Sequence, residues 1–357
     1  MQTNNIKKLQ DKLKDGNCGA MIYSPHNRRY FTGFASSDGI LFVTNARAVL
    51  FVDSRYCEAA KKQAQDCVVV LLENTKSQLQ ELVKRLSVKA IGIEAFDLPV
   101  STAERFRGML PDVSFDLTNG LSETIAALRM IKEDYEIENM KKAQKITDDA
   151  FDHILGFIKP GVAERDIALE IEYFMKKNGA SGPSFDLIAV SGENSSLPHG
   201  VPGDRKLKTG DFLTMDIGAV VGGYCSDMTR TVAIGKISAE QKKVYDTVLK
   251  AQLAAEEALG PGKNGDEIDK IARDIIDGAG YRGCFGHGLG HSVGLQIHEE
   301  PRLSPSCKTT LQPGMTITVE PGIYLEGRFG VRIEDMAMIT KDGSFIFTQS
   351  PKELITL

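Results

Sequence analysis

Paired carboxylates on strand-like segments constrain this chain more than any other feature of its sequence. The first pair is in FLTMDIGAVVGGYCSDMTRTVAIG, where Asp216 and Asp227 are symmetric about a point within the turn candidate Val221-Gly222-Gly223. A hairpin with this turn would bring the two aspartates directly opposite each other. Opposed like charges destabilise a strand pair unless something positive lies between them. The segment therefore predicts a hairpin whose aspartates need a positive group between them.

A second segment, TITVEPGIYLEGRFGVRIEDMAMIT, repeats this arrangement with Glu320 and Glu334, which are equally distant from Gly327. Pro321 and Gly322 would distort this hairpin, so its symmetry is a guide to the register. A single pair could equally have a structural origin, with a neighbouring arginine as its counter-charge. Two pairs favour a metal site, because four carboxylates are too many for one tetrahedral zinc ion but suit two ions that share ligands.

Histidines are scarce in the chain, yet three of the six, His287, His291 and His298, lie within GHGLGHSVGLQIHEEP. A helix would place His287 and His291 one turn apart. The four glycines of the stretch disfavour a helix by about 1 kcal/mol each. We therefore expect a loop or irregular strand that lets a ligand come close. The alternative is a glycine-rich connection whose histidines have no common task.

The composition is that of an ordinary soluble globular protein, and 357 residues are enough for two domains. Lys and Arg total 43 against 48 for Asp and Glu, so no bulk positive field is available to bind nucleic acid. The six cysteines form no CxxC pair, and the chain opens with the charged stretch MQTNNIKKLQDKLKDGN. We expect free thiols in a cytoplasmic protein. No membrane span is expected, because no apolar run approaches about 18 residues.

Alternating element patterns divide the chain into two parts. In the first part we expect a strand hairpin in ILFVTNARAVLFVD, buried strands in VVVLL and AIGIEA, and a helix in STAERFRGML before the strand VSFDL. Residues 122–158 then continue with helical periodicity until Pro160-Gly161 stops it. Helices and strands alternate from there to the end. The sequence predicts an α/β domain over residues 1–121 and an α+β domain over residues 122–357.

These motifs, in this order, resemble those of the pita-bread metallopeptidases, a family that includes methionine aminopeptidase, aminopeptidase P and prolidase. The resemblance begins in the first domain with NRRYFTGFASSDG and FVDSRY and continues through ALRMIKEDYEIENMKKA. In the second domain it includes PHG, TMDIGA, SDMTRT, GHGLGHSVGLQIHEEP, TVEPGIY and GVRIEDM. It implies a creatinase-like N-terminal α/β domain followed by an α+β catalytic domain with the pita-bread (creatinase/aminopeptidase) fold.

The resemblance implies five metal ligands, which are Asp216, Asp227, His291, Glu320 and Glu334. Asp227 and Glu334 would bridge two ions. The family's metal histidine lies seven residues before the histidine of the HE pair, which selects His291 rather than His287. The ions implied are two divalent cations, manganese or cobalt, with zinc or iron as alternatives.

The resemblance also implies roles around the scissile bond. His298 would donate a hydrogen bond to the developing oxyanion, and His199 would contact the scissile amide from the other side. Glu320 would carry a proton from the attacking water to the leaving nitrogen, and Arg332 would orient Glu334 or the substrate. The side chains expected to bind the substrate are His287, Arg302 and Tyr324.

Two features favour the proline-specific branch of the family, namely the large first domain and the extra upstream histidine of HGLGH. HEEPRL is similar to prolidase, since Arg302 could pair with the free carboxylate of a dipeptide. The resemblance thus implies hydrolysis of the Xaa-Pro bond in short proline-containing peptides, by a dipeptidase or by an aminopeptidase that accepts longer peptides. A homodimer is expected. His26 and His153 are expected to be structural or exposed.

Other activities on the same fold are a methionine aminopeptidase-like activity, a metal-independent creatinase-like hydrolase and a non-catalytic binding module. The last two have lost metal ligands, and the complete set of five disfavours them here.

Overall fold

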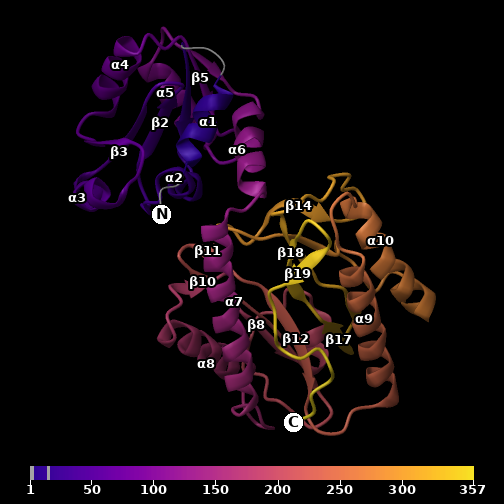
Figure 1. Ribbon diagram of the computed structural model, residues 1–357. Coiled ribbons are helices and arrows are strands. Elements are labelled where there is room, and N and C mark those ends of the chain that lie inside the picture. The colour runs from indigo at the N-terminus through magenta and orange to yellow at the C-terminus, as the bar shows by residue number, and fades with distance from the viewer. Residues whose placement is uncertain (1–3, 14–16) are drawn as a thin grey trace. The chain divides into compact units, whose positions relative to one another are not determined.

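The computed structural model describes residues 4–13 and 17–357, and the chain divides into two compact units, Met1–Arg129 and Met130–Leu357 (Figure 1). The sequence predicts a boundary between residues 121 and 122, near the start of helix α6 (Gly120–Met130), whereas the units divide near its end. Residues 1–3 and 14–16 of the charged opening stretch lie outside the described residues.

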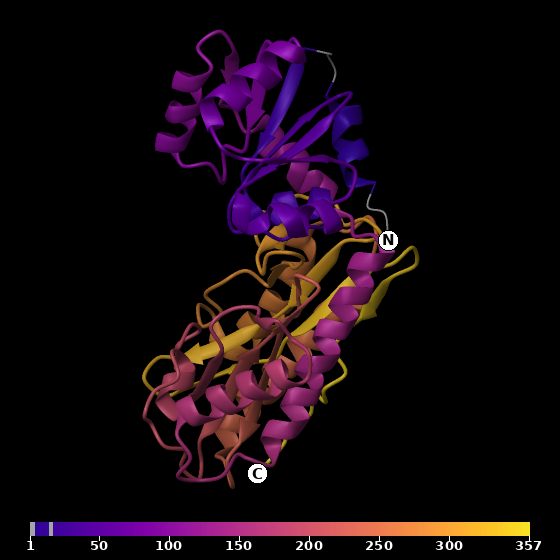
Figure 2. The same cartoon turned by 90° about the vertical axis from the view of Figure 1, so that its left-hand side faces the viewer.

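The first unit contains one mixed six-stranded sheet in the order β4-β3-β2-β1-β5-β6. Its strands are β1 (Cys18–Ile22), β2 (Ile40–Thr44), β3 (Ala48–Val52), β4 (Val68–Leu71), β5 (Ala90–Ile93) and β6 (Ser114–Asp116). Its further helices are α1 (Asn5–Lys12), α2 (Pro25–Thr32), α3 (Ser54–Gln63), α4 (Thr75–Arg85) and α5 (Val100–Met109). The predicted hairpin is β2 and β3, which pair antiparallel, and β4 to β6 with α5 match the other predicted elements. Helices flank this sheet on two sides (Figure 2).

The predicted helical segment over residues 122–158 is two helices rather than one, α6 and α7 (Asp134–Leu155). The break has a local cause, because Glu133 caps α7. The carboxylate of Glu133 accepts from the third backbone amide of the helix, and the side chain of Glu136 accepts from the amide of Glu133. The hydrophobic periodicity continues across this cap and therefore does not reveal it. The sequence prediction of one uninterrupted helical segment was wrong for this reason.

The second unit places helices on both sides of several short sheets. The helices are α7, α8 (Glu164–Lys177), α9 (Ala239–Glu257) and α10 (Gly265–Ile276), with a 3-10 turn η1 (Gly192–Ser196) and a π turn η2 (Asp277–Tyr281). The strands of its first half are β7 (Gly182–Pro183), β8 (Ile188–Ser191), β9 (Phe212–Ile217), β10 (Ala219–Val221), β11 (Tyr224–Cys225) and β12 (Met228–Ala233). Those of its second half are β13 (Gly290–Ser292), β14 (Glu299–Leu303), β15 (Thr316–Val319), β16 (Gly322–Leu325), β17 (Phe329–Arg332), β18 (Asp335–Ile339) and β19 (Ser344–Ile346).

The strands of the second unit pack against the helices through two separate apolar cores. Residues of α7 and α8, such as Phe151 and Ile171, pack with Met215 of β9 in one core. Residues of α9 and α10, such as Val248 and Ile268, belong to the core that contains β15 and β17. Figure 1 shows α7 and α8 on one side of the strands and α9 and α10 on the other. The predicted metal ligands lie in, or directly beside, the strands between the two helix pairs.

The first predicted hairpin has a different register from the one expected. Asp216 of β9 lies opposite Thr229 of β12, so Asp227 is diagonal to Asp216 and not directly opposite it. The cause is the turn, in which Gly222 and Gly223 both have positive φ, 58° and 88°. Such a two-residue turn is centred one position later than the sequence symmetry suggests. The prediction of direct opposition was wrong, although a two-residue step keeps both side chains on one face.

The second predicted pairing is confirmed. The pairs β15–β18 and β16–β17 share one continuous register on either side of the ligand positions. That register sets Glu320 opposite Glu334, even though the strands are interrupted at Pro321. Gly327, at the centre of the turn, has a positive φ of 67°.

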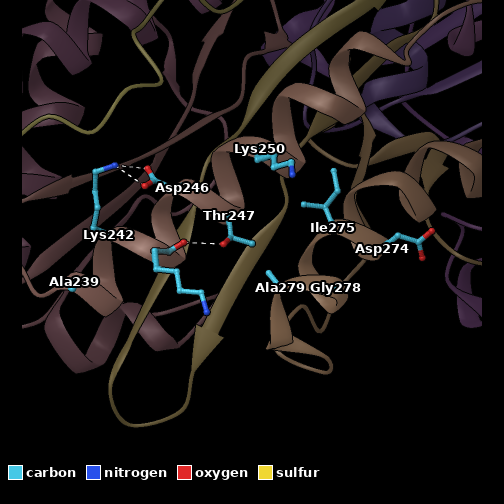
Figure 3. Close-up of a pocket in the computed structure, with 10 residues that line it drawn as sticks. Ala239, Lys242, Asp246, Thr247, Lys250, Asp274, Ile275, Gly278 and Ala279 are labelled. Carbon is cyan, nitrogen blue, oxygen red and sulfur yellow. Dashed lines mark hydrogen bonds and ion pairs between the residues drawn. The ribbon is translucent and has the colours of Figure 1, made fainter.

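A cleft of about 690 Å³ lies between α9 and the end of α10 (Figure 3). Lys242 in this cleft is paired with Asp246, and the Thr247 hydroxyl donates to the Lys243 carbonyl at 2.8 Å. None of the five predicted metal ligands is among the described residues that line it. Its charges therefore belong to the solvated faces of two helices and not to the predicted metal site.

All six cysteines are free, as expected from their spacing. Among residues 4–13 and 17–357, no helix has both the length and the apolar character that crossing a bilayer requires.

Candidate metal centre

Three of the predicted ligands meet where separate strand pairs converge. Asp227 directly precedes β12, His291 lies in β13, and Glu334 directly precedes β18. One candidate ligand atom from each of them lies within 4.8 Å of the other two. All three residues are buried. Chain segments far apart in sequence thus gather two carboxylates and an imidazole at one point.

The other two predicted ligands border this cluster. Oε1 of Glu320 lies 3.4 Å from Nε2 of His291, and Oδ2 of Asp227 lies 3.6 Å from the same nitrogen. Oδ2 of Asp216 accepts from Arg332 at 2.6 Å, whereas its Oδ1 is buried with no hydrogen-bond partner among the described residues. A buried carboxylate oxygen without a partner is costly. This oxygen fits a cation.

The clustered carboxylates raise one another's pKa. Burial, followed by the charges of Glu334 and Asp216, raises the pKa of Asp227 well above its usual range. Burial, followed by Glu320 and Asp216, does the same for the pKa of Glu334. The pKa of Glu320 rises to about 8 through burial, with Arg332 opposing the rise and Asp216 adding to it. Divalent cations would allow these carboxylates to ionise together, and oxygen donors with one imidazole suit such ions.

Arg332 connects two of the ligands. Besides Asp216, it donates from Nε to Oγ1 of Thr229 at 3.0 Å, and that hydroxyl donates to Oε2 of Glu334 at 2.7 Å. Its Nη1 donates to the Tyr324 hydroxyl at 2.9 Å. Burial raises the pKa of Tyr324 to about 12, so the phenol stays protonated near neutral pH. Arg332 is itself buried, so it belongs to the interior of the site and is not a surface arginine.

Two threonines orient the ligands, and the sequence prediction missed both. The hydroxyl of Thr318 accepts from the amide of His291 at 3.0 Å and donates to Oε1 of Glu320 at 3.3 Å. The hydroxyl of Thr229 likewise donates to Glu334, while it accepts from the side chain of Arg332. The available signal was spacing, because Thr229 follows Asp227 by two residues and Thr318 precedes Glu320 by two. Residues two apart on a strand share a face, and such partners commonly orient metal ligands.

The stretch with three histidines is irregular, as predicted, with only the short strand β13 before β14. Two of its glycines are required by close approach. A Cβ at Gly290 would lie 1.9 Å from the Thr318 carbonyl oxygen, and one at Gly294 would lie 2.6 Å from the Glu299 carboxylate oxygens. Larger residues would push β13 away from β15 and open the loop that follows it.

The three histidines occupy different environments. Nε2 of His287 lies 3.0 Å from the Tyr324 hydroxyl and Nδ1 lies 2.8 Å from the Gly288 carbonyl oxygen. Burial lowers the pKa of His287 to about 4. Burial, and then the neighbouring His298, lowers the pKa of His291 to about 3. Both rings are therefore neutral near pH 7, and a neutral imidazole is the form that binds metals.

Three of the residues predicted to contact the substrate, His199, His298 and Arg302, are exposed or partly exposed. His298 is exposed, with its ring edge-on to His291 and the ring centroids 4.5 Å apart. Partial burial, then Arg302 and His199, lowers the pKa of His298. His199 is exposed in the turn after η1. Arg302 lies opposite His291 in the β13–β14 ladder, and its side chain is 41% exposed.

The two remaining histidines are exposed, as expected. His26 is exposed on α2. His153 bonds to Glu170 at 2.7 Å and stacks on Phe174, which joins α7 to α8.

Comparisons with known proteins are consistent with this geometry. Residues 138–341 match the model of Metallopeptidase family M24, and residues 5–131 match the Creatinase/Prolidase N-terminal domain. The chain is 37% identical over 353 residues to an Xaa-Pro dipeptidase of Pyrococcus horikoshii, with 98% of each chain covered. It is also similar to the solved structure of an Xaa-Pro dipeptidase from Bacillus anthracis, with a TM-score of 0.95, 41% identity and 99% of both chains covered. An X-Pro aminopeptidase from Thermotoga maritima MSB8 matches with a TM-score of 0.91 and 35% identity, covering 98% of this chain and 100% of that one.

Replacement of two histidines should separate metal binding from turnover. We expect His291→Ala to lose bound metal, because its imidazole lies among the clustered carboxylates. His298→Ala should keep its metal but lower kcat by about 100-fold, the typical effect of removing one oxyanion donor. Elemental analysis after metal loading and desalting, together with peptide hydrolysis, measures both. Equal metal loss in the two variants would contradict the assignment.

The stability of the metal-free protein should fall as pH rises. The pKa of Glu320 in the folded protein is about 8, above its ordinary value of 4.5, so the folded state holds a proton that the unfolded state releases. The stabilisation is complete below about pH 4.5 and is lost as pH rises through about 8, by roughly 4 to 5 kcal/mol. Urea unfolding with chelator across this range measures it. Saturating manganese should remove the decline, and a flat profile without metal would refute the expectation.

Proposed function

The chain belongs to metallopeptidase family M24, and on that premise we propose that it hydrolyses the Xaa-Pro bond of short peptides and releases the N-terminal residue. Membership of this family confirms the resemblance drawn from the sequence motifs and the predicted fold class. The observation that carries the proposal is the buried cluster of carboxylates around His291, with exposed histidines beside it. Proline specificity is supported by relatives described as Xaa-Pro dipeptidases and an X-Pro aminopeptidase.

Membership of a metallopeptidase family implies that the chain uses a divalent metal. We propose that the centre holds two ions, manganese or cobalt, with zinc or iron as alternatives. The proposed ligands are Asp216, Asp227, His291, Glu320 and Glu334. When bound, the ions would lower the pKa of the attacking water and polarise the scissile carbonyl. The unpartnered Oδ1 of Asp216 and the raised pKa values of its neighbours support this set.

The side chains around the ions have separate tasks in the proposed reaction. Glu320 takes the proton released by the attacking water and delivers it to the proline nitrogen, which must be protonated to leave. His298 donates a hydrogen bond to the developing oxyanion through the N–H of its neutral ring. His199 contacts the scissile amide from the other side. Arg302 and His199 both lower the pKa of His298, which supports placing these three residues near one another.

Substrate contact by Tyr324 and His287 stays a prediction. The Tyr324 hydroxyl is already bound to both His287 and Arg332. We assign to this pair the additional task of orienting Arg332, which in turn keeps the carboxylate of Asp216 in place.

Two candidate substrates differ in whether a free carboxylate follows the proline. A dipeptide places that carboxylate next to the ring, within the charge-assisted reach of Arg302. A longer peptide replaces it with an amide and gains nothing from this arginine. The position of Arg302 opposite His291, half exposed beside the ligands, favours the dipeptide. Cleavage of longer peptides is the second candidate, since an X-Pro aminopeptidase is among the similar structures.

We further propose that the protein acts in the cytoplasm as a homodimer. The six free cysteines support a reducing compartment. The homodimer rests on the family resemblance alone.

Hydrolysis of three peptides tests the proposed function. With manganese present, we expect cleavage of Ala-Pro, weaker cleavage of Ala-Pro-Ala and little of Met-Ala-Ser, with all activity lost to chelator. Arg302→Ala should raise KM for Ala-Pro by about 10- to 100-fold, the typical worth of a charge-assisted pair. It should barely change KM for Ala-Pro-Ala.

The matched control is Arg282→Ala, because the side chain of Arg282 is 85% exposed and pairs with Asp277. Equal effects of Arg302→Ala on both proline peptides would favour the aminopeptidase. Preference for Met-Ala-Ser would overturn proline specificity, and activity that survives chelation would overturn the metal mechanism.

A further inference from the structure

A buried lysine at the start of the second unit reaches both ends of the loop between His291 and His298. Nζ of Lys132 donates to Oγ of Ser292 at 3.0 Å and to Oε2 of Glu299 at 3.2 Å. The Lys132 side chain is 1% exposed and that of Glu299 is 7% exposed. Ser292 directly follows the proposed ligand His291, and Glu299 directly follows the proposed oxyanion donor His298. One ammonium group therefore spans the two positions that flank the loop.

The loop itself closes around the carboxylate of Glu299. Oε1 of Glu299 accepts from the amide of Gln296 at 3.1 Å, and the amide of Gly294 donates to the Gln296 carbonyl at 3.0 Å. A Cβ at Gly294 would collide with the same carboxylate. Ser292 and Glu299 are partners in the β13–β14 ladder, next to an irregularity in its register. The carboxylate thus fixes the path that the chain takes from one histidine to the other.

The positive charge of Lys132 compensates the negative charge of the buried Glu299 carboxylate. A buried carboxylate is stable only when it is paired and hydrogen-bonded. A second carboxylate, Glu136 of α7, lies near the pair and accepts from the Tyr224 hydroxyl at 2.9 Å. Burial raises the pKa of Glu136, while Lys132 lowers it and Glu299 raises it. The ammonium group of Lys132 thus stabilises the charge of Glu299 by direct contact and favours the charged form of Glu136 from a distance.

We propose that Lys132 is a positioning residue for His298. By holding Ser292 and Glu299 together, it sets the place of the His298 ring against His291, where the ring centroids lie 4.5 Å apart. The Lys132 backbone is itself fixed, because its amide donates to the Gly314 carbonyl at 2.9 Å. This inference rests on the proposed function, in which His298 acts on the substrate and His291 on the metal.

Lys132→Met tests the inference, since methionine keeps much of the length and apolar stem but removes the ammonium. We expect kcat for Ala-Pro to fall by about 10- to 100-fold, because a displacement of about 1 Å at a reacting group costs this much. Metal content should be retained and KM should change by less than about threefold. Lys145→Met is the matched control, because Lys145 forms an exposed pair with Asp149 on α7. It should change neither constant.

Two double variants distinguish positioning from a general loss of structure. In a His298→Ala background, Lys132→Met should lower kcat by less than about twofold, because the residue acts through the ring that has been removed. Lys132→Met/Glu299→Gln also removes the buried carboxylate charge that the ammonium of Lys132 compensates, so it should recover the unfolding midpoint of the protein but not its kcat. It also supplies a folded protein for measurement if Lys132→Met alone fails to fold.

Three results would overturn the inference: an unchanged kcat in Lys132→Met, an equal fall with and without His298, or recovery of kcat in the double variant. A wild-type protein that leaves Ala-Pro intact in manganese would instead overturn the proposed function. The two failures are therefore distinguishable in one set of assays.

Discussion

Mutual repulsion among four clustered carboxylates, two of them buried and two partly buried, is the constraint on which the candidate metal centre of the second unit depends. Their charges stand in a region of low dielectric, where like charges interact strongly and are expensive to keep without compensation. Arg332 supplies one positive charge from within the chain, and it contacts Asp216 directly. The remaining charge calls for cations. The repulsion that makes this cluster unfavourable without metal ions is also what would make it bind divalent cations strongly.

Strands provide the rigidity that such a cluster needs. Asp216 and Asp227 come from the β9–β12 pair, His291 from β13, and Glu320 and Glu334 from the interruptions between β15, β16, β17 and β18. Two helix pairs press these strands together through separate apolar cores. Threonine hydroxyls, Arg332 and the buried Lys132 then orient the side chains and the loop. The segments that follow η1 and β13 carry the exposed His199 and His298.

Much of the site could be predicted from the sequence because strand geometry is periodic. Equal spacing about Gly327 was enough to set Glu320 opposite Glu334, and the structure has that register on both sides of the pair. The same reasoning gave the wrong register for Asp216 and Asp227, because the centre of their hairpin lies one position later than their spacing suggests. There the turn residues, Gly222 and Gly223, both adopt positive φ and shift the centre of the hairpin. Spacing alone does not show which residues a turn uses.

Other features depend on contacts that no local pattern contains. The contact of Lys132 with Ser292 and Glu299 joins residues about 160 positions apart. The break between α6 and α7 follows from a capping box that interrupts an otherwise continuous periodicity. Thr229 and Thr318 left a signal in their two-residue spacing from the ligands. That signal acquires meaning only once the ligands are known, since threonine is common in strands.

Anomalous scattering from crystals of the manganese-loaded protein tests the central claim most directly. If the carboxylates are held together for cations, two peaks should lie among Asp216, Asp227, His291, Glu320 and Glu334, a few ångströms apart and bridged by Asp227 and Glu334. A single peak would contradict the dinuclear centre. No peak within this cluster at saturating manganese would contradict the account as a whole.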